Sequence, residues 1–296
     1  MWLILDKLLY NLKILLQRLF MNIAIIGLGL MGGSLALSLK KLDFVKKVVG
    51  HDHNLQHQKD AIELKLVDKL VEFDEIKEYD VIFLAIPVNG VIATLKNLTD
   101  VSYDTTIVDL GSTKEIIVAS VPPKIRKNFV ASHPMTGTEN FGPHAAIEGL
   151  YDEKVVVLCD LEESGEIQAK TARNIFKSLG MKKYFMSAHE HDRHAAFISH
   201  MPHAISYSIA NTVMKQENKH NILALAAGGF RSMSRLAKSS PHMWEDIFRQ
   251  NRGNLLEAIG LFEDELSKLK QDIVDEDWDS VSEIMNQGKT LHEILD

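Results

Sequence analysis

Residues 22–33 read NIAIIGLGLMGG, an apolar run that passes directly into a glycine-rich turn. The run NIAII is typical of a buried strand, and the stretch GSLALSLKK at 33–41 is typical of a helix. A strand, a Gly-x-Gly-x-x-Gly turn and a helix in this order are the fingerprint of a dinucleotide-binding unit. The stretch therefore predicts an α/β domain that binds a dinucleotide at the turn.

The positions of this turn have separate tasks. Gly27 permits the tight turn, Gly29 lets the backbone approach a pyrophosphate, and Gly32 lets helix and strand pack closely. Leu30 and Met31 lie at the start of the expected helix, whose free N–H groups and dipole favour an anion. We predict that these five residues bind the cofactor.

Asp52 ends the next strand-like run, twenty residues after Gly32. A carboxylate there accepts hydrogen bonds from the adenine ribose and repels the 2′-phosphate of NADP, and no arginine follows it in HDHNLQH. We therefore predict NAD as the cofactor, although a protonated His53 would partly offset the repulsion. Pro87 follows a later strand-like run, and it is predicted either to line the cofactor cleft or simply to end its strand.

Further short, β-branched runs follow along the chain: KKVVGHD, DVIFLAI, TTIVDL, NFVAS, KVVVLCD and KKYFMS. Such runs, separated by crossover-length segments, predict a parallel sheet covered on both faces. From about residue 188 the strand signals stop, and apolar residues recur at helical spacing. The prediction is a Rossmann-type doubly wound α/β domain over 21–187, followed by an all-helical domain over 188–296 that serves substrate binding and dimerisation. The clearest helical seam comprises Leu255, Ile259, Phe262, Leu266, Leu269 and Ile273.

This seam requires a partner helix, either in the same chain or in a second copy. An interlocked helical homodimer is our hypothesis. The net charge of −7 argues against a nucleic-acid partner, because phosphate binding needs a basic surface. The single cysteine, Cys159, excludes an internal disulfide and fits a reducing compartment, so a cytoplasmic protein is expected.

Residues 1–20 are apolar but carry Asp6, Lys7, Lys13 and Arg18. These charges argue against a secretory signal and against a membrane span. The leucines between them recur at helical spacing, which predicts an amphipathic helix. We expect Met21 to be the natural start; a surface or membrane-associating helix is the alternative.

The stretch SHPMTGTE at 132–139 follows a strand-like run, so its polar residues should lie at an end of the sheet. His133 is the candidate acid or base, because an imidazole titrates near neutrality, although a histidine after a strand can also be structural. The histidine-rich stretch HEHDRH at 189–194 invites a metal interpretation. A zinc-protease HExxH pattern would need histidine where Arg193 stands, and cysteine partners are lacking, so we predict no metal site.

Six motifs together resemble the prephenate and arogenate dehydrogenase family: GLGLMGGS, DLGSTK, SHPMTGTE, HD followed by SHMPHA, GGFRSMSRLA and SPHMWEDI. They occur in family order with family-like spacing between about residues 21 and 255. The resemblance implies an NAD-dependent oxidative decarboxylation of prephenate to 4-hydroxyphenylpyruvate in tyrosine biosynthesis. Arogenate, with an amino group in place of the keto group, is the alternative substrate, because the motifs do not separate the two.

Two further hypotheses differ in class. One is a catalytically inactive, dinucleotide-sensing protein, which is disfavoured because His133, Ser112 and Arg235 occur together. The other is a dehydrogenase of β-hydroxyacids, which would usually place a catalytic lysine in the helical half, where no such motif stands out.

The same resemblance implies roles for single residues. His133 would polarise the C4 hydroxyl of the substrate, with Ser112 beside it to fix its orientation. Arg235 would bind a substrate carboxylate, for which the planar guanidinium fork is suited. The other residues implied for substrate binding, or for the ionic network near it, are His203, His200, Gly229, Glu139 at the entrance, and Asp192. Ser232 stands where some relatives have an acidic residue, so the charge of the pocket is expected to differ.

Overall fold

One eight-stranded sheet forms the centre of the computed structural model, which describes residues 20–295. The predicted amphipathic segment of residues 1–20 therefore lies, apart from Phe20, outside the described residues. The strands follow the order β3-β2-β1-β4-β5-β6-β7-β8 across the sheet. Their bounds are β1 Met21–Ile26, β2 Val45–His51, β3 Lys69–Leu70, β4 Val81–Leu84, β5 Thr106–Asp109, β6 Phe129–Pro134, β7 Val155–Cys159 and β8 Lys182–Met186.

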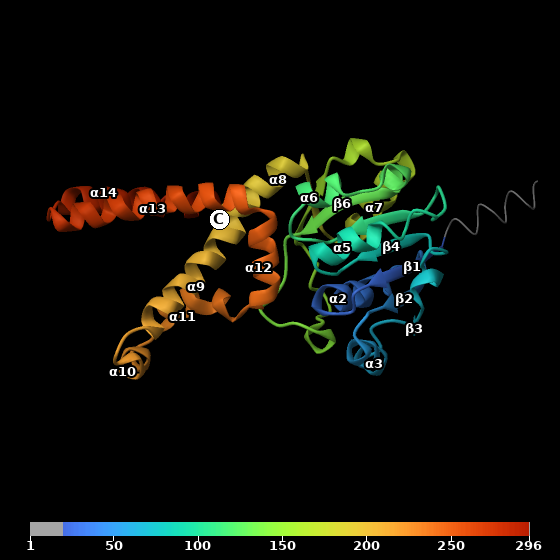
Figure 1. Cartoon of the computed structure of the whole chain (residues 1–296), viewed down its shortest axis with the longest axis horizontal. Coiled ribbons are helices and arrows are strands. Elements are labelled where there is room, and N and C mark those ends of the chain that lie inside the picture. Colours follow the sequence, from blue (N-terminus) through green and yellow to red (C-terminus); the bar gives the residue numbers. More distant parts are fainter. Residues whose placement is uncertain (1–19, 296) are drawn as a thin grey trace, which may run out of the picture.

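The strands from β1 to β6 run parallel and confirm the predicted doubly wound fold. The direction of winding reverses between β1 and β4, and ligands bind at the carboxyl ends of the strands at such a point. Along β1, Ile23 and Ile25 join one buried cluster, while Ala24 and Ile26 join the other. Both faces of the sheet are thus covered, which explains the continuously apolar strand runs. The helices of this half (Figure 1) are α2 Leu30–Leu39, α3 Leu55–Glu63, α4 Phe73–Ile76, α5 Val88–Leu95, α6 Glu115–Ala119 and α7 Glu166–Ser178.

The prediction of a parallel sheet holds for β1 to β6 but not for its last two strands, because β7 runs antiparallel to β6 and β8 pairs parallel to β7. The connection between them, residues 135–154, contains a single short 3-10 helix, Pro143–Ala145. Without a crossover helix to return it to the opposite edge, the chain re-enters the sheet from the edge that it left. Residues 135–154 therefore stay at the carboxyl edge of the parallel strands.

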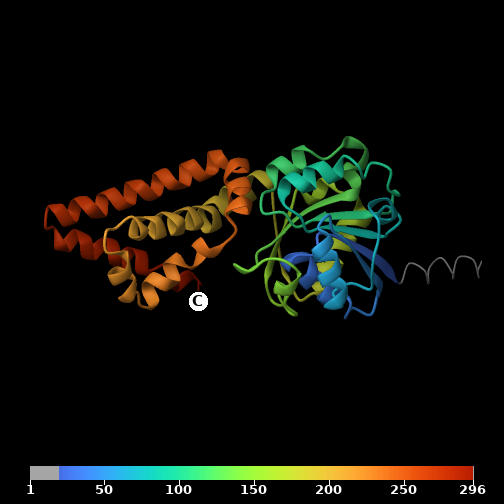
Figure 2. The ribbon, with the colours of Figure 1, turned by 60° about the horizontal axis from the view of Figure 1, so that its bottom comes forward.

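Helices make up the rest of the chain, from α8 onward. Figure 1 shows α13 and α14 side by side as one arm, and α9 with α10 and α11 as another; Figure 2 shows the same helices beside the sheet half. Within residues 20–295 none of the helices has the length and apolar character needed to cross a bilayer. The bounds are α8 Ala188–Ala195, a π-helix Ala196–His200, α9 Met201–Met214, α10 Lys219–Ala224, α11 Gly228–Ser234, a 3-10 turn Arg235–Lys238, α12 Pro241–Gln250, α13 Arg252–Val274, α14 Trp278–Lys289 and α15 His292–Leu295.

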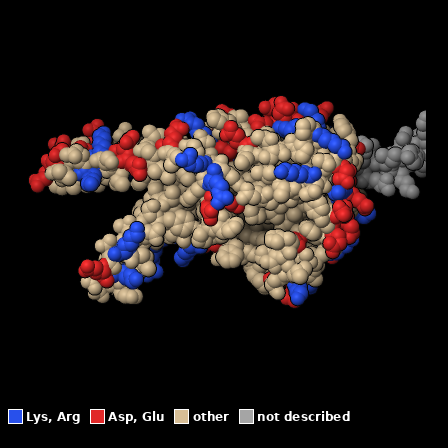
Figure 3. Space-filling model, in the orientation of Figure 1, with Lys and Arg blue, Asp and Glu red and all other residues tan. Residues whose placement is uncertain are grey.

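The predicted seam on α13 is only partly covered. Leu255 is buried near the start of the helix, whereas Leu266 is 52% exposed and Ile273 is 47% exposed further along. The space-filling view shows a notch between the two arms (Figure 3). The seam thus keeps an outward apolar portion that the described chain does not cover.

Candidate active site

Two glycines of the 27–32 turn are required by close backbone contacts. Gly27 has a φ of +94°, and a Cβ there would lie 2.4 Å from the carbonyl oxygen of Ala85. A Cβ on Gly32 would lie 1.8 Å from the carbonyl oxygen of Gly27. Gly29 differs. A Cβ there would lie 3.9 Å from its nearest neighbour outside the turn, the backbone nitrogen of Gly142. The backbone at Gly29 is therefore open to a ligand.

Helix α2 begins just after this opening and suits an anion. It has no side-chain cap and no acidic residue in its first turn, so the N–H groups of Leu30 and Met31 are available to a phosphate. Leu30 is buried and Met31 is half-buried. The predicted pyrophosphate site therefore has the donors that such a group needs.

Asp52 lies beside the turn at the end of β2 and is only 5% exposed. Its carboxylate accepts hydrogen bonds from the backbone N–H groups of Leu28 at 2.8 Å and Asn54 at 2.9 Å. His57 and His53 approach the same carboxylate at 3.4 and 3.5 Å. The acidic group is thus held in place next to the glycine turn, where an adenine ribose would lie.

Pro87 is exposed and caps the start of α5, directly after β4. Its neighbour Ile86 lies against the turn, since a Cβ on Gly27 would be 2.6 Å from the Ile86 Cγ2 atom. Pro87 is therefore close enough to border a ligand at the turn.

His133 lies near the carboxyl end of β6, and its Nδ1 atom is 2.8 Å from the Nε2 atom of His191. The Nδ1 atom of His191 is in turn 2.8 Å from the Asp192 Oδ1 atom. Asp192 also accepts hydrogen bonds from the backbone N–H groups of Lys114 at 2.7 Å and Glu115 at 2.9 Å. A chain of hydrogen bonds thus runs from β6 through α8 to the start of α6.

Burial sets the charge of these groups. It lowers the pKa of His133 well below the ordinary 6.5, and the charge of Lys114 and the protonatable rings of His191 and His200 lower it further. Burial also lowers the pKa of His191, against the opposing hydrogen bond to Asp192. For Asp192, burial alone would raise the pKa, but hydrogen bonds from His191 and from the backbone bring it below its ordinary value. At neutral pH the two histidines are therefore neutral and Asp192 is ionised.

A buried lysine fixes the strands around His133. Lys114 is fully buried, and its ammonium group forms an ion pair with Asp109 at the end of β5. The same group donates a hydrogen bond to the carbonyl oxygen of Ser132 at 2.8 Å, next to His133 in β6. The side chain of Ser112, in the turn between β5 and α6, has no hydrogen-bond partner within residues 20–295. Its hydroxyl remains a predicted contact for a ligand or for His133.

His200 and His203 meet on the indole ring of Trp244 in α12. The His203 ring stacks on it at 3.5 Å, and the His200 ring meets it edge-on at 6.0 Å. The two histidines thus share one face, as their spacing predicts. The Nε1 atom of Trp244 is buried, and it has no hydrogen-bond partner within the described chain. Such a donor is suited to a water or a polar ligand.

The two histidines differ in their surroundings. His203 donates from Nδ1 to the carbonyl oxygen of Ser199 at 2.9 Å; burial lowers its pKa, and the charge of Arg235 lowers it further. The Nδ1 atom of His200 is 3.0 Å from the amide nitrogen of Asn251, and burial lowers the pKa of His200 to about 4. His200 is therefore buried beside both Trp244 and Asn251, while His203 is close to the charge of Arg235.

Arg235 and Glu139 bring the helical half and the 135–154 connection together. Their side chains form an ion pair at 3.6 Å, with Arg235 54% exposed and Glu139 28% exposed. Gly229 is exposed on α11, which ends directly before Arg235. Arg235 thus pairs with Glu139 of the connection, and its charge reaches His203 of α9.

Sequence reasoning left His191, Asn251 and Trp244 without roles. The signal for His191 was available, since Ser187 and Glu190 form a capping box that fixes which histidines of α8 face inward. Asn251 lies 59 residues from Asp192, whose backbone it contacts, and 51 residues from His200, whose ring it contacts, so no local pattern reveals it.

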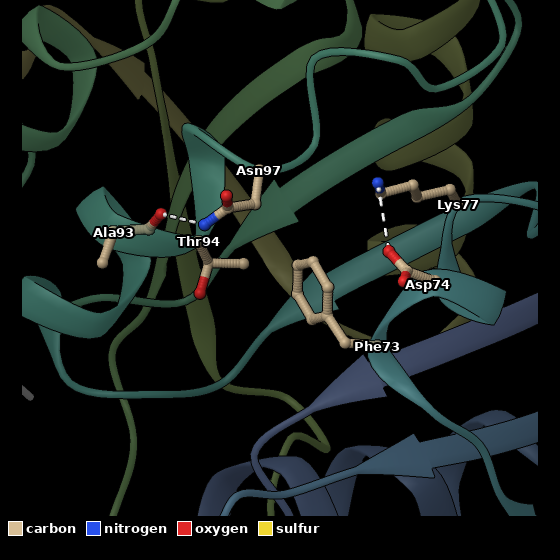
Figure 4. A pocket seen from close by; sticks show the side chains of 6 residues that line it. All are labelled: Phe73, Asp74, Lys77, Ala93, Thr94 and Asn97. Atoms are coloured by element: carbon tan, nitrogen blue, oxygen red, sulfur yellow. Dashed lines mark hydrogen bonds and ion pairs between the residues drawn. The ribbon is translucent and has the colours of Figure 1, made fainter.

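Outside this region, residues 20–295 offer neither a second catalytic pocket nor a metal site. A surface hollow of about 300 Å³ lies between α4 and α5 (Figure 4), but its one cation, Lys77, is already paired with Asp74 and Asp100. Within the described residues, histidine, cysteine and carboxylate side chains form no group of three or more that is suited to a metal ion. The chemistry therefore centres on the groups around His133.

Two family models match consecutive parts of the chain. The model described as prephenate dehydrogenase, nucleotide-binding domain, matches residues 35–185, and that of the prephenate dehydrogenase dimerization domain matches residues 187–287. The "Prephenate dehydrogenase" of Bacillus subtilis (strain 168) is 30% identical over 281 residues, covering 93% of this chain and 76% of its own. The "Cyclohexadienyl dehydrogenase" of Zymomonas mobilis is 32% identical over 290 residues, covering 93% of this chain and 98% of its own.

Solved structures agree with these matches. Prephenate dehydrogenase from Aquifex aeolicus, in complex with hydroxyphenyl propionate and NAD⁺, superposes with a TM-score of 0.87 at 31% identity, covering 94% of this chain and 99% of its own. Synechocystis arogenate dehydrogenase superposes with a TM-score of 0.78 at 25% identity, covering 93% of this chain and all of its own. Relatives with both substrate names thus share this fold.

Proposed function

This chain belongs to the prephenate dehydrogenase family, and from that premise we propose that it is an NAD-dependent prephenate dehydrogenase. In the proposed reaction, prephenate and NAD⁺ give 4-hydroxyphenylpyruvate, carbon dioxide and NADH. The observation that carries the proposal is His133, an uncharged imidazole fixed at the same sheet edge as the glycine turn.

His133 has the properties that the proton transfer requires. It is neutral at neutral pH, so a ring nitrogen can accept the proton of the C4 hydroxyl of prephenate. Bound NAD supplies the acceptor for the hydride on the same carbon. Because loss of the ring carboxylate restores aromaticity, the protein mainly has to align the ring and take up one proton.

The residues around the glycine turn suit NAD. Gly29 leaves room for a pyrophosphate, and the uncapped start of α2 offers N–H groups to it. The Asp52 carboxylate is positioned to bind the ribose hydroxyls, and its charge disfavours a 2′-phosphate. These observations support NAD over NADP.

Arg235 is the proposed anchor for a carboxylate of the substrate. Its guanidinium is half exposed and pairs with Glu139, so an incoming carboxylate can replace Glu139 as its partner. His203 stacks on Trp244, whose buried Nε1 atom has no hydrogen-bond partner within the described residues and is a further donor. Prephenate carries both of its carboxylates on the C1 side of the ring and its reacting hydroxyl on C4, so carboxylate donors at one end of the site and His133 at the other would suit it.

Arogenate is the second candidate, because relatives named for either substrate share the fold. It carries an additional ammonium group. Arg231 and Arg235 lie four residues apart in this region, and Glu139 is the carboxylate that reaches Arg235. The two arginine charges outweigh the single carboxylate of Glu139, so the region repels an ammonium group, which favours prephenate.

The decisive experiment measures absorbance at 340 nm with prephenate or arogenate, each with NAD or NADP. We expect the highest kcat/KM for prephenate with NAD. A higher value for arogenate would overturn the substrate assignment, and a higher value with NADP would overturn the cofactor assignment. No reduction with any pair would favour a dinucleotide sensor without catalytic activity.

We also propose that the protein is a homodimer through its helical half. The outward part of the α13 seam, including Leu266 and Ile273, is about half exposed, and the family model that matches this half is that of a dimerization domain. A second copy would remove this apolar surface from water. Light scattering should give twice the chain mass, and Leu266→Glu should shift the protein toward monomer. A monomeric wild type would contradict the proposal.

A further inference from the structure

His191 lies between His133 and Asp192, and the hydrogen-bond chain fixes which nitrogen of each ring carries a proton. Asp192 is ionised and can only accept, so the Nδ1 atom of His191 must donate to it. A neutral histidine protonated at Nδ1 has an unprotonated Nε2 atom. The Nε2 atom of His191 therefore accepts, and the Nδ1 atom of His133 donates to it.

His133, at the end of this hydrogen-bond chain, is the residue that reacts. A neutral His133 that carries its proton on Nδ1 has a free lone pair on Nε2. This tautomer, assigned from the hydrogen-bond network, leaves Nε2 as the atom that can take a proton. The opposite tautomer would place a hydrogen on Nε2 and prevent proton uptake there.

We propose that His191 is the positioning residue that holds His133 in the proton-accepting tautomer, with Asp192 as the group that fixes His191. This inference rests on the proposed function, because it gives His133 the task of accepting the proton of the substrate hydroxyl. When His133 takes that proton on Nε2, its Nδ1–H continues to donate to the neutral His191. The positive charge that forms on His133 is thus stabilised by the Nε2 atom of His191, which already accepts its hydrogen bond.

The fold keeps His191 rigid. The capping box of Ser187 and Glu190 fixes the start of α8, with Ser187 Oγ accepting from the N–H of Glu190 at 3.1 Å. His191 and Asp192 are each only 2% exposed. Asn251 donates to the carbonyl oxygen of Asp192 at 2.6 Å, which ties this turn of α8 to the start of α13. The ring of His191 therefore has little freedom to turn away from His133.

Two substitutions separate positioning from packing. Leucine at position 191 fills a similar volume and offers no acceptor, whereas glutamine offers an amide oxygen to the Nδ1–H of His133. We expect His191→Leu to lower kcat by roughly 10²-fold, and His191→Gln to recover to within about tenfold of wild type. His194, exposed on the same helix, provides the matched control, and His194→Leu should keep wild-type kinetics.

Two readouts show whether the loss comes from the tautomer. In protein without substrate, nitrogen NMR of the histidine rings should show His133 protonated at Nδ1, with its signal identified by its absence in His133→Asn. In His191→Leu this signal should change to the Nε2–H form or to a mixture. The acidic limb of the kcat/KM profile should also move to lower pH, because the imidazolium of His133 loses its acceptor while the charge of Lys114 still opposes it.

The outcomes separate this inference from the proposed function. Wild-type kcat in His191→Leu, combined with an inactive His133→Asn, overturns the role of His191 alone. An active His133→Asn overturns the proposed function. Equal losses in the leucine and glutamine variants with an unchanged His133 signal would show a merely structural role. If His191→Leu does not fold, as judged by its melting temperature and NAD affinity, an Nε2–H His133 in the wild type still contradicts the inference.

Discussion

His133 is a base whose strength is limited by its burial. The low-dielectric surroundings keep the ring neutral, which makes it ready to accept a proton, but they also disfavour the imidazolium that results. Hydrogen bonding through His191 offsets part of that cost. Turnover should therefore depend on both the ring and its partner.

We expect His133→Asn to lower kcat by roughly 10²- to 10⁴-fold, because asparagine keeps a polar side chain but cannot take up a proton. NAD affinity, measured by titration calorimetry, should stay at the wild-type value, since the glycine turn is untouched. His194→Asn serves as the exposed control. Unchanged turnover in His133→Asn would remove this residue from the mechanism.

Arg235→Ala should raise the KM for prephenate by roughly 10- to 100-fold with a smaller effect on kcat, because a charge-assisted hydrogen bond to the substrate is lost. Arg235→Lys should fall between the alanine variant and wild type, since lysine keeps the charge but not the planar fork. Arg193, an exposed arginine paired with Glu257 at 3.4 Å, offers the control Arg193→Ala. Steady-state kinetics check all three variants, and a normal KM in Arg235→Ala would place the carboxylate anchor elsewhere.

At this scale the sequence supports predictions that depend on side-chain chemistry and fails for those that depend on distant contacts. His133 and Arg235 could be named because each stands in a recognisable motif. The partnership of His133 with His191 joins residues 58 positions apart. It depends on how α8 docks against β6, and no spacing along the chain records that docking.

At the scale of the elements, the sequence predicts that β7 is a strand but does not predict its direction. The run KVVVLC predicts a strand correctly, because apolar β-branched residues mark a buried strand whichever way it runs. Its antiparallel direction follows from the connection before it, which lacks a crossover helix. The two-residue strand β3 was not predicted, because it is too short to carry a periodic pattern.

The junction of β1 and α2 allows two glycines to be tested against each other. Gly32→Ala should destabilise the fold by about 2 kcal/mol or more, because its methyl group would collide with the carbonyl oxygen of Gly27. Gly29→Ala should keep the melting temperature, since Gly29 has a φ of −72° and open space around its Cβ position. It should still weaken NAD binding, because the methyl group occupies the approach of the pyrophosphate. Equal melting temperatures for the two variants would contradict this assignment.

For the molecule as a whole, the buried histidines predict a loss of stability in acid. Burial lowers the pKa values of His133, His191, His203 and His200, in the last case to about 4. Below about pH 6.5 the unfolded chain therefore binds protons that the folded chain does not, so the free energy of unfolding decreases as the pH falls toward 4.

His200 alone should account for roughly 2 kcal/mol of this loss between about pH 6.5 and pH 5. Urea unfolding at a series of pH values measures it. His200→Asn should flatten the dependence, whereas the exposed-site variant His194→Asn should not. A free energy of unfolding that stays constant over this range would show that the histidines are not buried in solution as they are in this fold.

The hydrogen bonds from the backbone of Lys114 and Glu115 to Asp192 cross from the sheet half to the helical half of the chain. Asp192 holds His191, and His191 orients His133, so the proton acceptor is ready only while the two halves are docked. A hinge movement that separates α8 from the start of α6 would release the acceptor before it disturbed the glycine turn. The protein would then still bind its dinucleotide but would not oxidise its substrate. Activity therefore depends on the docking of the helical half against the sheet half.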